Sequence, residues 1–124
     1  MMRALVVDDD LSDIMMLKKA LAAVSPDIDI HTCTSVGDAR KLLLRCRFDI
    51  IFLDVRVPPE DGIVFLEEIR NSQMLRLQKV VMVSGVDGPL DRLAARSLNT
   101  AFFVKPIAMV DVKRLIAECG HPPI

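Results

Sequence analysis

The chain has few of the residues that soft-metal sites, disulfides and histidine catalysis require. Its 124 residues include no tryptophan, no tyrosine, two histidines and three cysteines, and the cysteines are widely spaced with no CxxC pair. This composition argues against a zinc site, a disulfide framework and a histidine-based catalytic site. We therefore expect Cys33, Cys46 and Cys119 to be small, buried apolar groups.

An excess of charge of one sign is also missing. Sixteen Lys and Arg residues balance 17 Asp and Glu residues, for a formal net charge of −1. Without an overall positive field, direct binding to nucleic acid or to an anionic membrane is not expected. The first residues, MMRALVVDDD, have one Arg and a short apolar run that ends in three acids, which fits neither a signal peptide nor a membrane span. We expect a cytoplasmic protein.

What the chain does have is enough apolar sequence for one core. A length of 124 residues with 52% hydrophobic residues predicts a single domain over residues 1–124. Short apolar runs bounded by charged or turn residues predict buried parallel strands. These runs cover residues 4–7, 50–53, 80–83 and 101–104, and an alternating run over 28–33 predicts an edge strand.

Segments with helical spacing lie between and after these runs. They cover residues 12–24, 36–46, 61–71, 90–98 and 110–119, with Ser12 as the predicted N-cap of the first and Gly120 as the stop of the last. Asn99 follows the fourth helix and tolerates a left-handed conformation. The alternation predicts an α/β fold, a five-stranded doubly wound parallel sheet with five helices on its two faces.

Polar residues follow four of the predicted strands directly. They are Asp8, Asp9 and Asp10 after the first strand, Asp54 after the third, Ser84 after the fourth, and Lys105 with Pro106 after the fifth. Ligand sites of open parallel sheets lie beyond the carboxyl ends of the strands, so we expect these residues to converge there. Asp10 is expected to complement the positive end of the first helix.

Several carboxylates at one edge require a counter-charge. Two of them a few ångströms apart repel by roughly 4 kcal/mol at an effective dielectric constant near 20. Oxygen ligands without His or Cys favour a hard divalent cation, and Mg²⁺ fits a site with few carboxylates and room for phosphate oxygens. Lys105 and Ser84 add the donors that a phosphoryl group in transfer needs, which leaves a carboxylate as its acceptor.

Four segments in register resemble one known family. LVVDDD, FLDVRVPPEDG, MVSG and FFVKP follow the order and approximate spacing of the receiver domain of two-component response regulators, the chemotaxis-type phosphoacceptor module. The resemblance spans nearly the whole chain and implies a flavodoxin-like (βα)5 fold.

The resemblance also implies roles for single residues. Asp54 corresponds to the phosphoacceptor, and Asp9 with Asp54 corresponds to the pair that binds Mg²⁺ directly. Asp8 would act through a coordinated water, and the backbone carbonyl of Arg56 would supply a further ligand. Lys105 corresponds to the phosphate-binding lysine, and the bond to Pro106 would be cis.

The same resemblance implies a switch rather than an enzyme, with only self-directed phosphotransfer and dephosphorylation. Ser84 and Phe102 occupy its switch positions, where the family more often has Thr and Tyr. The output surface would comprise the fourth helix, fifth strand and fifth helix, with homodimerisation there as one option. A histidine kinase or histidine phosphotransfer protein would supply the phosphoryl group, with Asp13, Met16 and Pro106 as contacts. A downstream effector protein or domain would receive the signal.

Two alternatives remain at this point. Asp8 and Asp10 have the spacing of the nucleophile and acid of a haloacid dehalogenase-type phosphatase, although that interpretation gives Asp54 no role. A receiver-like module that binds partners without phosphorylation is the other alternative.

Overall fold

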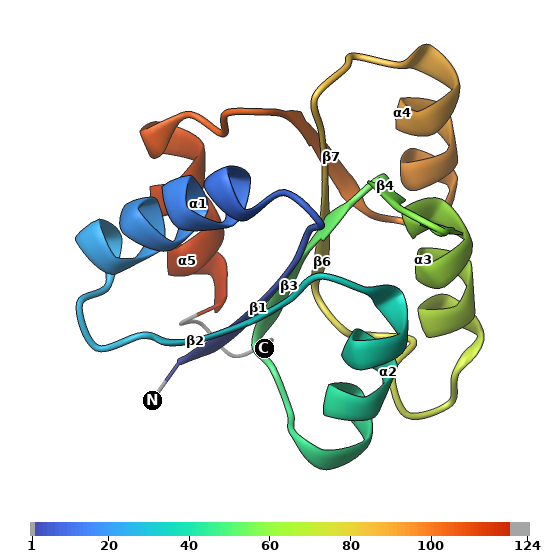
Figure 1. Ribbon diagram of the computed structural model, residues 1–124, viewed down its shortest axis with the longest axis horizontal. Coiled ribbons are helices and arrows are strands. Elements are labelled where there is room, and N and C mark those ends of the chain that lie inside the picture. Colours follow the sequence, from blue (N-terminus) through green and yellow to red (C-terminus); the bar gives the residue numbers. More distant parts are fainter. Residues whose placement is uncertain (1, 120–124) are drawn as a thin grey trace.

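The computed structural model describes residues 2–119, which form a parallel five-stranded sheet between two layers of helices (Figure 1). The strand order is β2-β1-β3-β6-β7, and each neighbouring pair is parallel. The strands are β1 (Arg3–Val7), β2 (Asp29–Cys33), β3 (Ile50–Asp54), β6 (Val80–Ser84) and β7 (Ala101–Val104). The predicted strands are thus confirmed, including the position of the alternating run at an edge of the sheet.

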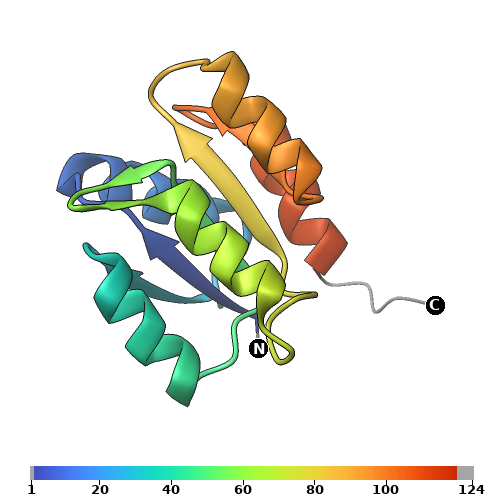
Figure 2. The same ribbon diagram turned by 90° about the vertical axis from the view of Figure 1, so that its right-hand side faces the viewer.

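Five helices connect and cover the strands. They are α1 (Leu11–Val24), α2 (Val36–Arg45), α3 (Gly62–Asn71), α4 (Pro89–Ser97) and α5 (Met109–Cys119). Helices α1 and α5 lie on one face of the sheet, and α2, α3 and α4 lie on the other (Figures 1 and 2). The doubly wound α/β fold predicted from the alternation is therefore confirmed.

The sheet has an apolar core on each face, because successive strand residues point to opposite sides. Leu5 and Leu53 pack toward α2, α3 and α4, whereas Val6 and Phe52 pack toward α1 and α5. Strands β1, β3 and β6 are buried along nearly their whole length, as strands covered on both faces must be. A rigid, buried sheet thus fixes the positions at which its strands end.

Several local predictions need correction. The N-cap of α1 is Asp10 and not Ser12, because the Asp10 carboxylate accepts hydrogen bonds from the backbone N–H groups of Ser12 and Asp13. Asp10 therefore does complement the start of α1, as expected. A short antiparallel hairpin of β4 (Arg56–Val57) and β5 (Glu60–Asp61) was not predicted, since two-residue strands leave no periodic pattern.

Other terminal and cysteine predictions have mixed outcomes. Asn99 has a left-handed φ of 57° after α4, as predicted. Cys33 is buried, but Cys46 and Cys119 are partly exposed, so the expectation of three buried cysteines was wrong for two of them.

The predicted helix stop at Gly120 lies outside the described residues. Within residues 2–119, no helix combines the length and apolar character that crossing a membrane requires.

Candidate functional site at the carboxyl edge of the sheet

The polar residues predicted to converge do lie at one edge of the sheet. Asp54 ends β3 and is in register with Val83, one residue before Ser84 at the end of β6. Asp8 continues from β1, and Lys105 continues from β7, with its backbone N–H bonded to the Ser84 carbonyl. The parallel strands bring these positions together although they are up to 97 residues apart in the chain.

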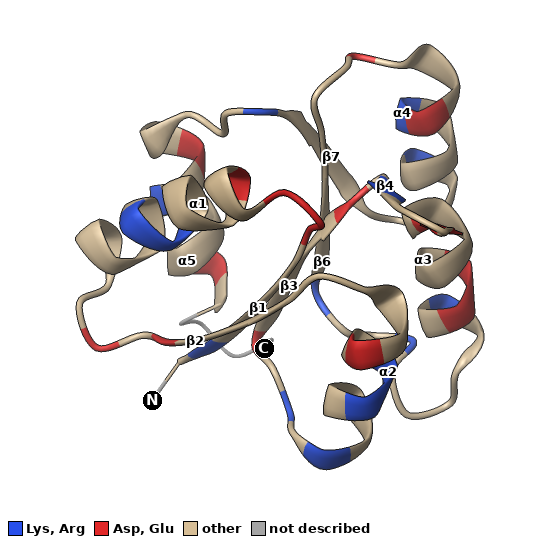
Figure 3. Cartoon of the chain, in the orientation of Figure 1, with Lys and Arg blue, Asp and Glu red and all other residues tan. Residues whose placement is uncertain are grey.

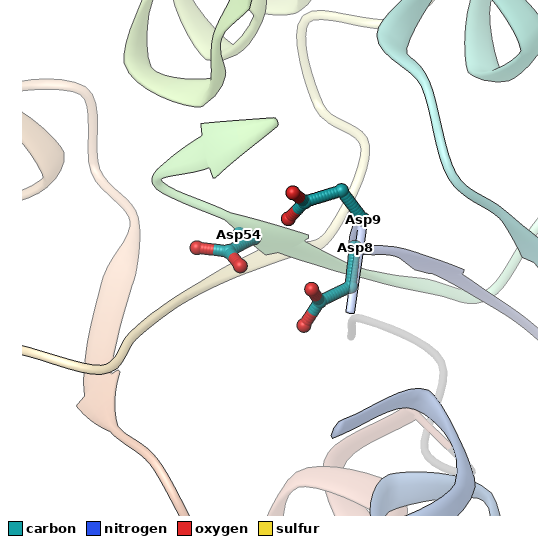
Figure 4. A group of neighbouring side chains, drawn as sticks. All are labelled: Asp8, Asp9 and Asp54. Atoms are coloured by element: carbon teal, nitrogen blue, oxygen red, sulfur yellow. The ribbon is translucent and has the colours of Figure 1, made fainter. Parts of the chain in front are cut away.

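Three carboxylates form the centre of the site. Figure 4 shows Asp8, Asp9 and Asp54 at the neighbouring ends of β1 and β3, and one oxygen from each lies within 4.8 Å of the others. Asp8 and Asp54 are buried, whereas Asp9 is exposed. Figure 3 shows the acidic loop after β1 that contributes two of the three. An all-oxygen donor set of this density suits a hard divalent cation.

The ammonium of Lys105 offsets part of this negative charge. Its Nζ donates to Oδ2 of Asp54 at 2.7 Å, of Asp8 at 2.8 Å and of Asp13 at 2.9 Å. Burial by itself would lower the pKa of Lys105, but the three carboxylates outweigh burial and raise the pKa above its usual value. Lys105 therefore stays protonated and can donate to an anion.

Asp8 is the least solvated carboxylate of the three. Burial raises its pKa, and the hydrogen bonds from Lys105 and from the backbone N–H of Asp10 oppose that rise only in part. The nearby charge of Asp54 raises the pKa further. The ionised form of Asp8 is therefore less favourable here than in water, and added positive charge nearby would stabilise it.

The β4–β5 hairpin forms the wall next to Asp54. The backbone N–H of Arg56 donates to Oδ1 of Asp54 at 3.1 Å, and the N–H of Gly62 donates to the Val55 carbonyl at 2.7 Å. A Cβ at Gly62 would overlap the backbone carbonyl oxygen of Asp54, so only glycine allows the hairpin to return this closely. The side chain of Arg56 is exposed to solvent.

The two predicted switch residues have backbone and core partners in this structure. Ser84 is buried, and its Oγ accepts from the backbone N–H of Val86 at 3.1 Å. Phe102 is only 9% exposed and packs in the core beside α4. The guanidinium of Arg92, which is also bonded to Asp87, lies 4.8 Å from the centre of the Phe102 ring. Sequence analysis missed this contact, because nothing in the spacing pairs an arginine of α4 with a β7 aromatic.

An apolar groove adjoins Lys105 between α1 and the segment after β7. It has a volume of about 400 Å³, and its lining includes Asp13, Met16, Lys105 and Pro106. Met16 is 55% exposed. The peptide bond between Lys105 and Pro106 is cis, as the resemblance implied. The hydrogen bond between Lys105 and Asp13 was not predicted. The available signal was the position of Asp13 in the first turn of α1, which directly follows the acidic loop.

Comparisons with known proteins bear on what this site is. The family model for the response regulator receiver domain matches residues 4–117. The chain belongs to this family. It is therefore a receiver domain of the kind found in two-component response regulators.

Individual relatives are consistent with this assignment. The receiver is 33% identical to the two-component response regulator ARR11 of Arabidopsis thaliana, covering 90% of this chain and 21% of that protein. It is 40% identical to protein-glutamate methylesterase/protein-glutamine glutaminase 2 of Xanthomonas oryzae, covering 90% of this chain and 31% of that protein. The receiver thus spans less than a third of the length of these two relatives.

A solved structure agrees with the fold. The signal receiver domain of a DNA-binding response regulator from Colwellia psychrerythraea superimposes with a TM-score of 0.88. The two sequences are 21% identical, and the match covers 95% of this chain and 97% of that one. The likeness establishes the same arrangement of strands and helices.

Proposed function

We propose that this receiver accepts a phosphoryl group on Asp54, from a histidine kinase or a histidine phosphotransfer protein, and thereby controls an output. The observation that supports this most is that Asp54 is buried, lies within 4.8 Å of oxygens of Asp8 and Asp9, and accepts a hydrogen bond from the ammonium of Lys105. A carboxylate in this place has both candidate metal ligands and a cationic donor next to it, and these can orient a phosphoryl group and offset its charge during transfer.

Mg²⁺ fits the all-oxygen donor set of Asp8, Asp9 and Asp54. Asp9 and Asp54 would bind it directly, Asp8 would act through water, and the backbone carbonyl of Arg56 would be a further ligand. When bound, Mg²⁺ would supply positive charge that offsets the carboxylates and the phosphoryl oxygens. The three acids lie close enough together to need such a charge, because Lys105 alone neutralises only one of them.

The proposed transfer moves the phosphoryl group between two nucleophiles. A carboxylate oxygen of Asp54 forms a bond to phosphorus while the bond from phosphorus to the donor's imidazole nitrogen breaks, and that nitrogen leaves with the electron pair. Hydrolysis ends the phosphorylated state: a water oxygen attacks phosphorus and the bond from phosphorus to the Asp54 oxygen breaks. Inorganic phosphate is released, a proton goes to solvent, and the Asp54 carboxylate is restored.

Ser84 and Phe102 provide a route from the site to the surface. A phosphoryl group on Asp54 adds acceptor oxygens between Lys105 and Ser84, so we expect the Ser84 hydroxyl to leave Val86 and turn toward them. That movement would change the packing of Phe102 and the adjoining face of α4, β7 and α5. Leu90 and Leu93 are exposed on α4, so this face has apolar side chains that an effector or a second receiver could cover.

The groove beside Lys105 is the proposed docking site for the phosphodonor. Asp13, Met16 and Pro106 line it, and it opens next to the ammonium that would meet the incoming phosphoryl group. Docking there would place the donor histidine near Asp54.

The two alternatives explain fewer features. A phosphatase with Asp10 as its acid would need that carboxylate to be free, but Asp10 is exposed and caps α1 through bonds to Ser12 and Asp13. A module that signals without phosphate would not require Lys105 between three carboxylates.

The test uses a small phosphodonor. The protein is incubated with Mg²⁺ and acetyl phosphate, and the intact mass is followed with and without EDTA for the wild type and for Asp54→Asn. We expect one Mg²⁺-dependent phosphoryl adduct, stable in acid and labile in base, in the wild type alone. Asp10→Asn is a matched control that removes a nearby charge and keeps a helix cap, and it should still be phosphorylated.

The remaining outcomes distinguish the alternatives. An adduct that persists in Asp54→Asn and maps to Asp8 would favour the phosphatase. If no adduct forms, a titration with beryllofluoride reveals whether hydrolysis is simply fast. Failure to bind beryllofluoride in the presence of Mg²⁺ would contradict the phosphoacceptor function and favour a phosphate-independent module.

A further inference from the structure

One of the three acceptors of Lys105 lies outside the acidic cluster. Asp13 belongs to α1, whereas Asp8 and Asp54 follow strands and share the cluster with Asp9. The side chain of Asp13 is 34% exposed, compared with 4% for Asp8 and 11% for Asp54. Even so, its bond to the ammonium, at 2.9 Å, is almost as short as the other two. Asp13 therefore binds Lys105 from the solvent side of the site.

The ammonium has no proton left for another acceptor. A protonated lysine has three N–H donors, and in this structure each can be assigned to one carboxylate. A phosphoryl oxygen that is to accept from Lys105 must therefore replace one of these carboxylates. The affinity of the site for an anion therefore depends on how strongly each of the three carboxylates holds Lys105.

Asp13 is the acceptor that should resist most when a cation occupies the cluster. A divalent cation among Asp8, Asp9 and Asp54 would offset the negative charge of those carboxylates and weaken their attraction for Lys105. Asp13 is not in the cluster, so its attraction for Lys105 would persist. The lysine would then be drawn toward α1 and the groove, away from Asp54.

The charge balance of the site leads to the same result. The three clustered carboxylates, a divalent cation and Lys105 are together formally neutral, and Asp13 leaves one net negative charge. That charge favours the binding of a cation and disfavours the binding of an anionic phosphoryl group.

We propose that Asp13 is a positioning residue that withholds Lys105 from the phosphoryl group, so that it strengthens metal binding and weakens anion binding at the same site. This inference rests on the proposed phosphoacceptor function. It predicts opposite signs for two affinities, whereas loss of a purely structural contact would weaken both.

The experiment compares the wild type with Asp13→Asn. Calorimetry measures the dissociation constant for Mg²⁺, and a second titration at saturating Mg²⁺ measures the affinity for beryllofluoride, a mimic of the phosphoryl group. For Asp13→Asn we expect Mg²⁺ binding to weaken by about 2- to 5-fold and beryllofluoride binding to tighten by about 3- to 10-fold, as loss of one partly screened charge would produce. Phosphorylation by acetyl phosphate, followed by intact mass, should be faster.

Two further variants serve as controls. Asp10→Asn makes the same change in charge one helical turn away, at a carboxylate that is not bonded to Lys105 and whose capping role Asn can keep. It should leave both affinities within about twofold of the wild type, because an exposed charge without direct contact is largely screened. Asp13→Glu keeps the charge and should restore wild-type values for both ligands.

The other outcomes overturn the proposal separately from the proposed function. If the wild type binds beryllofluoride and Asp13→Asn binds it equally or more weakly, Asp13 does not withhold Lys105. If Asp10→Asn matches Asp13→Asn, general charge is the cause and the contact is not. If the wild type neither binds beryllofluoride nor becomes phosphorylated, the phosphoacceptor function itself fails, and this inference fails with it.

Discussion

Two partly buried cations lie at opposite edges of the sheet, and their partners differ in kind. At the carboxyl edge, Lys105 donates to three carboxylates. At the other edge, Arg70 of α3 donates to the backbone carbonyls of Leu98, Arg76 and Gln78 and to the hydroxyl of Thr100. Burial lowers the pKa of Arg70, with no carboxylate to oppose it, whereas the pKa of Lys105 is raised.

The difference indicates at which edge the partners of the cation can be exchanged. The acceptors of Arg70 are neutral groups of the chain's own loops, so the guanidinium joins the end of α3 to the segments before β6 and β7 and has no anion to exchange. The acceptors of Lys105 are three carboxylates, which carry more negative charge than one ammonium can neutralise. A cation bound near them would weaken their attraction for the lysine. Arg70 joins parts of the fold, whereas Lys105 is the donor that the proposed phosphoryl group would meet by replacing one of its three carboxylates.

The largest expected effect tests how tightly the carboxyl edge is packed. Gly62→Ala should destabilise the protein by about 3 kcal/mol or more, because its Cβ would overlap the carbonyl oxygen of Asp54 and force the hairpin away. Mg²⁺ binding should weaken as well. Gly37→Ala, in α2 with open space around its Cβ, is the matched control and should change stability by less than about 1 kcal/mol. Equal denaturant midpoints for the two variants would contradict this packing.

The second prediction tests the role of the opposite edge. Arg70→Met should lower the free energy of unfolding by about 2–3 kcal/mol, because the Leu98 carbonyl after α4 and the Gln78 carbonyl before β6 lose their donor. The dissociation constant for Mg²⁺ should stay at the wild-type value in the folded protein. A variant that folds normally yet binds Mg²⁺ more weakly would show that the two edges are coupled.

The smallest expected effect concerns the charge of Asp8. Since its pKa is raised in the fold, the stability that its neutral form contributes is present below the usual value of 3.8 and is lost as pH rises through the folded pKa. Asp8→Asn should therefore be more stable than the wild type at pH 7 without Mg²⁺, by on the order of 1 kcal/mol.

The advantage of Asp8→Asn should shrink as pH falls, and saturating Mg²⁺ should reverse it by binding the wild type more tightly. Unfolding by denaturant at several pH values, with and without Mg²⁺, measures both effects. A variant that is less stable than the wild type at pH 7 without Mg²⁺ would indicate that Lys105 already compensates Asp8 fully.

Much of the site could be predicted because of how parallel sheets form. The apolar runs that end at Val7, Leu53 and Val83 indicate buried strands, and the polarity of parallel strands brings Asp8, Asp54 and the segment after β6 to one edge. The hairpin at Arg56–Asp61 escaped prediction, since its strands have only two residues each. The N-cap of α1 was misplaced by two residues because Asp10 and Ser12 are both good caps, and local sequence does not choose between them.

The sequence by itself determined the order of the strands and helices, the two apolar faces of the sheet and the polar residues at its carboxyl edge. Those features follow from local periodicity and from strand direction. Only the tertiary structure decided that Lys105 binds Asp13 as well as Asp8 and Asp54, and that Arg70 binds the Leu98 carbonyl and the Thr100 hydroxyl, 28 and 30 residues away. Such contacts depend on the packing of elements that are distant in the chain, and no local pattern encodes the distance between two side chains that only packing brings together.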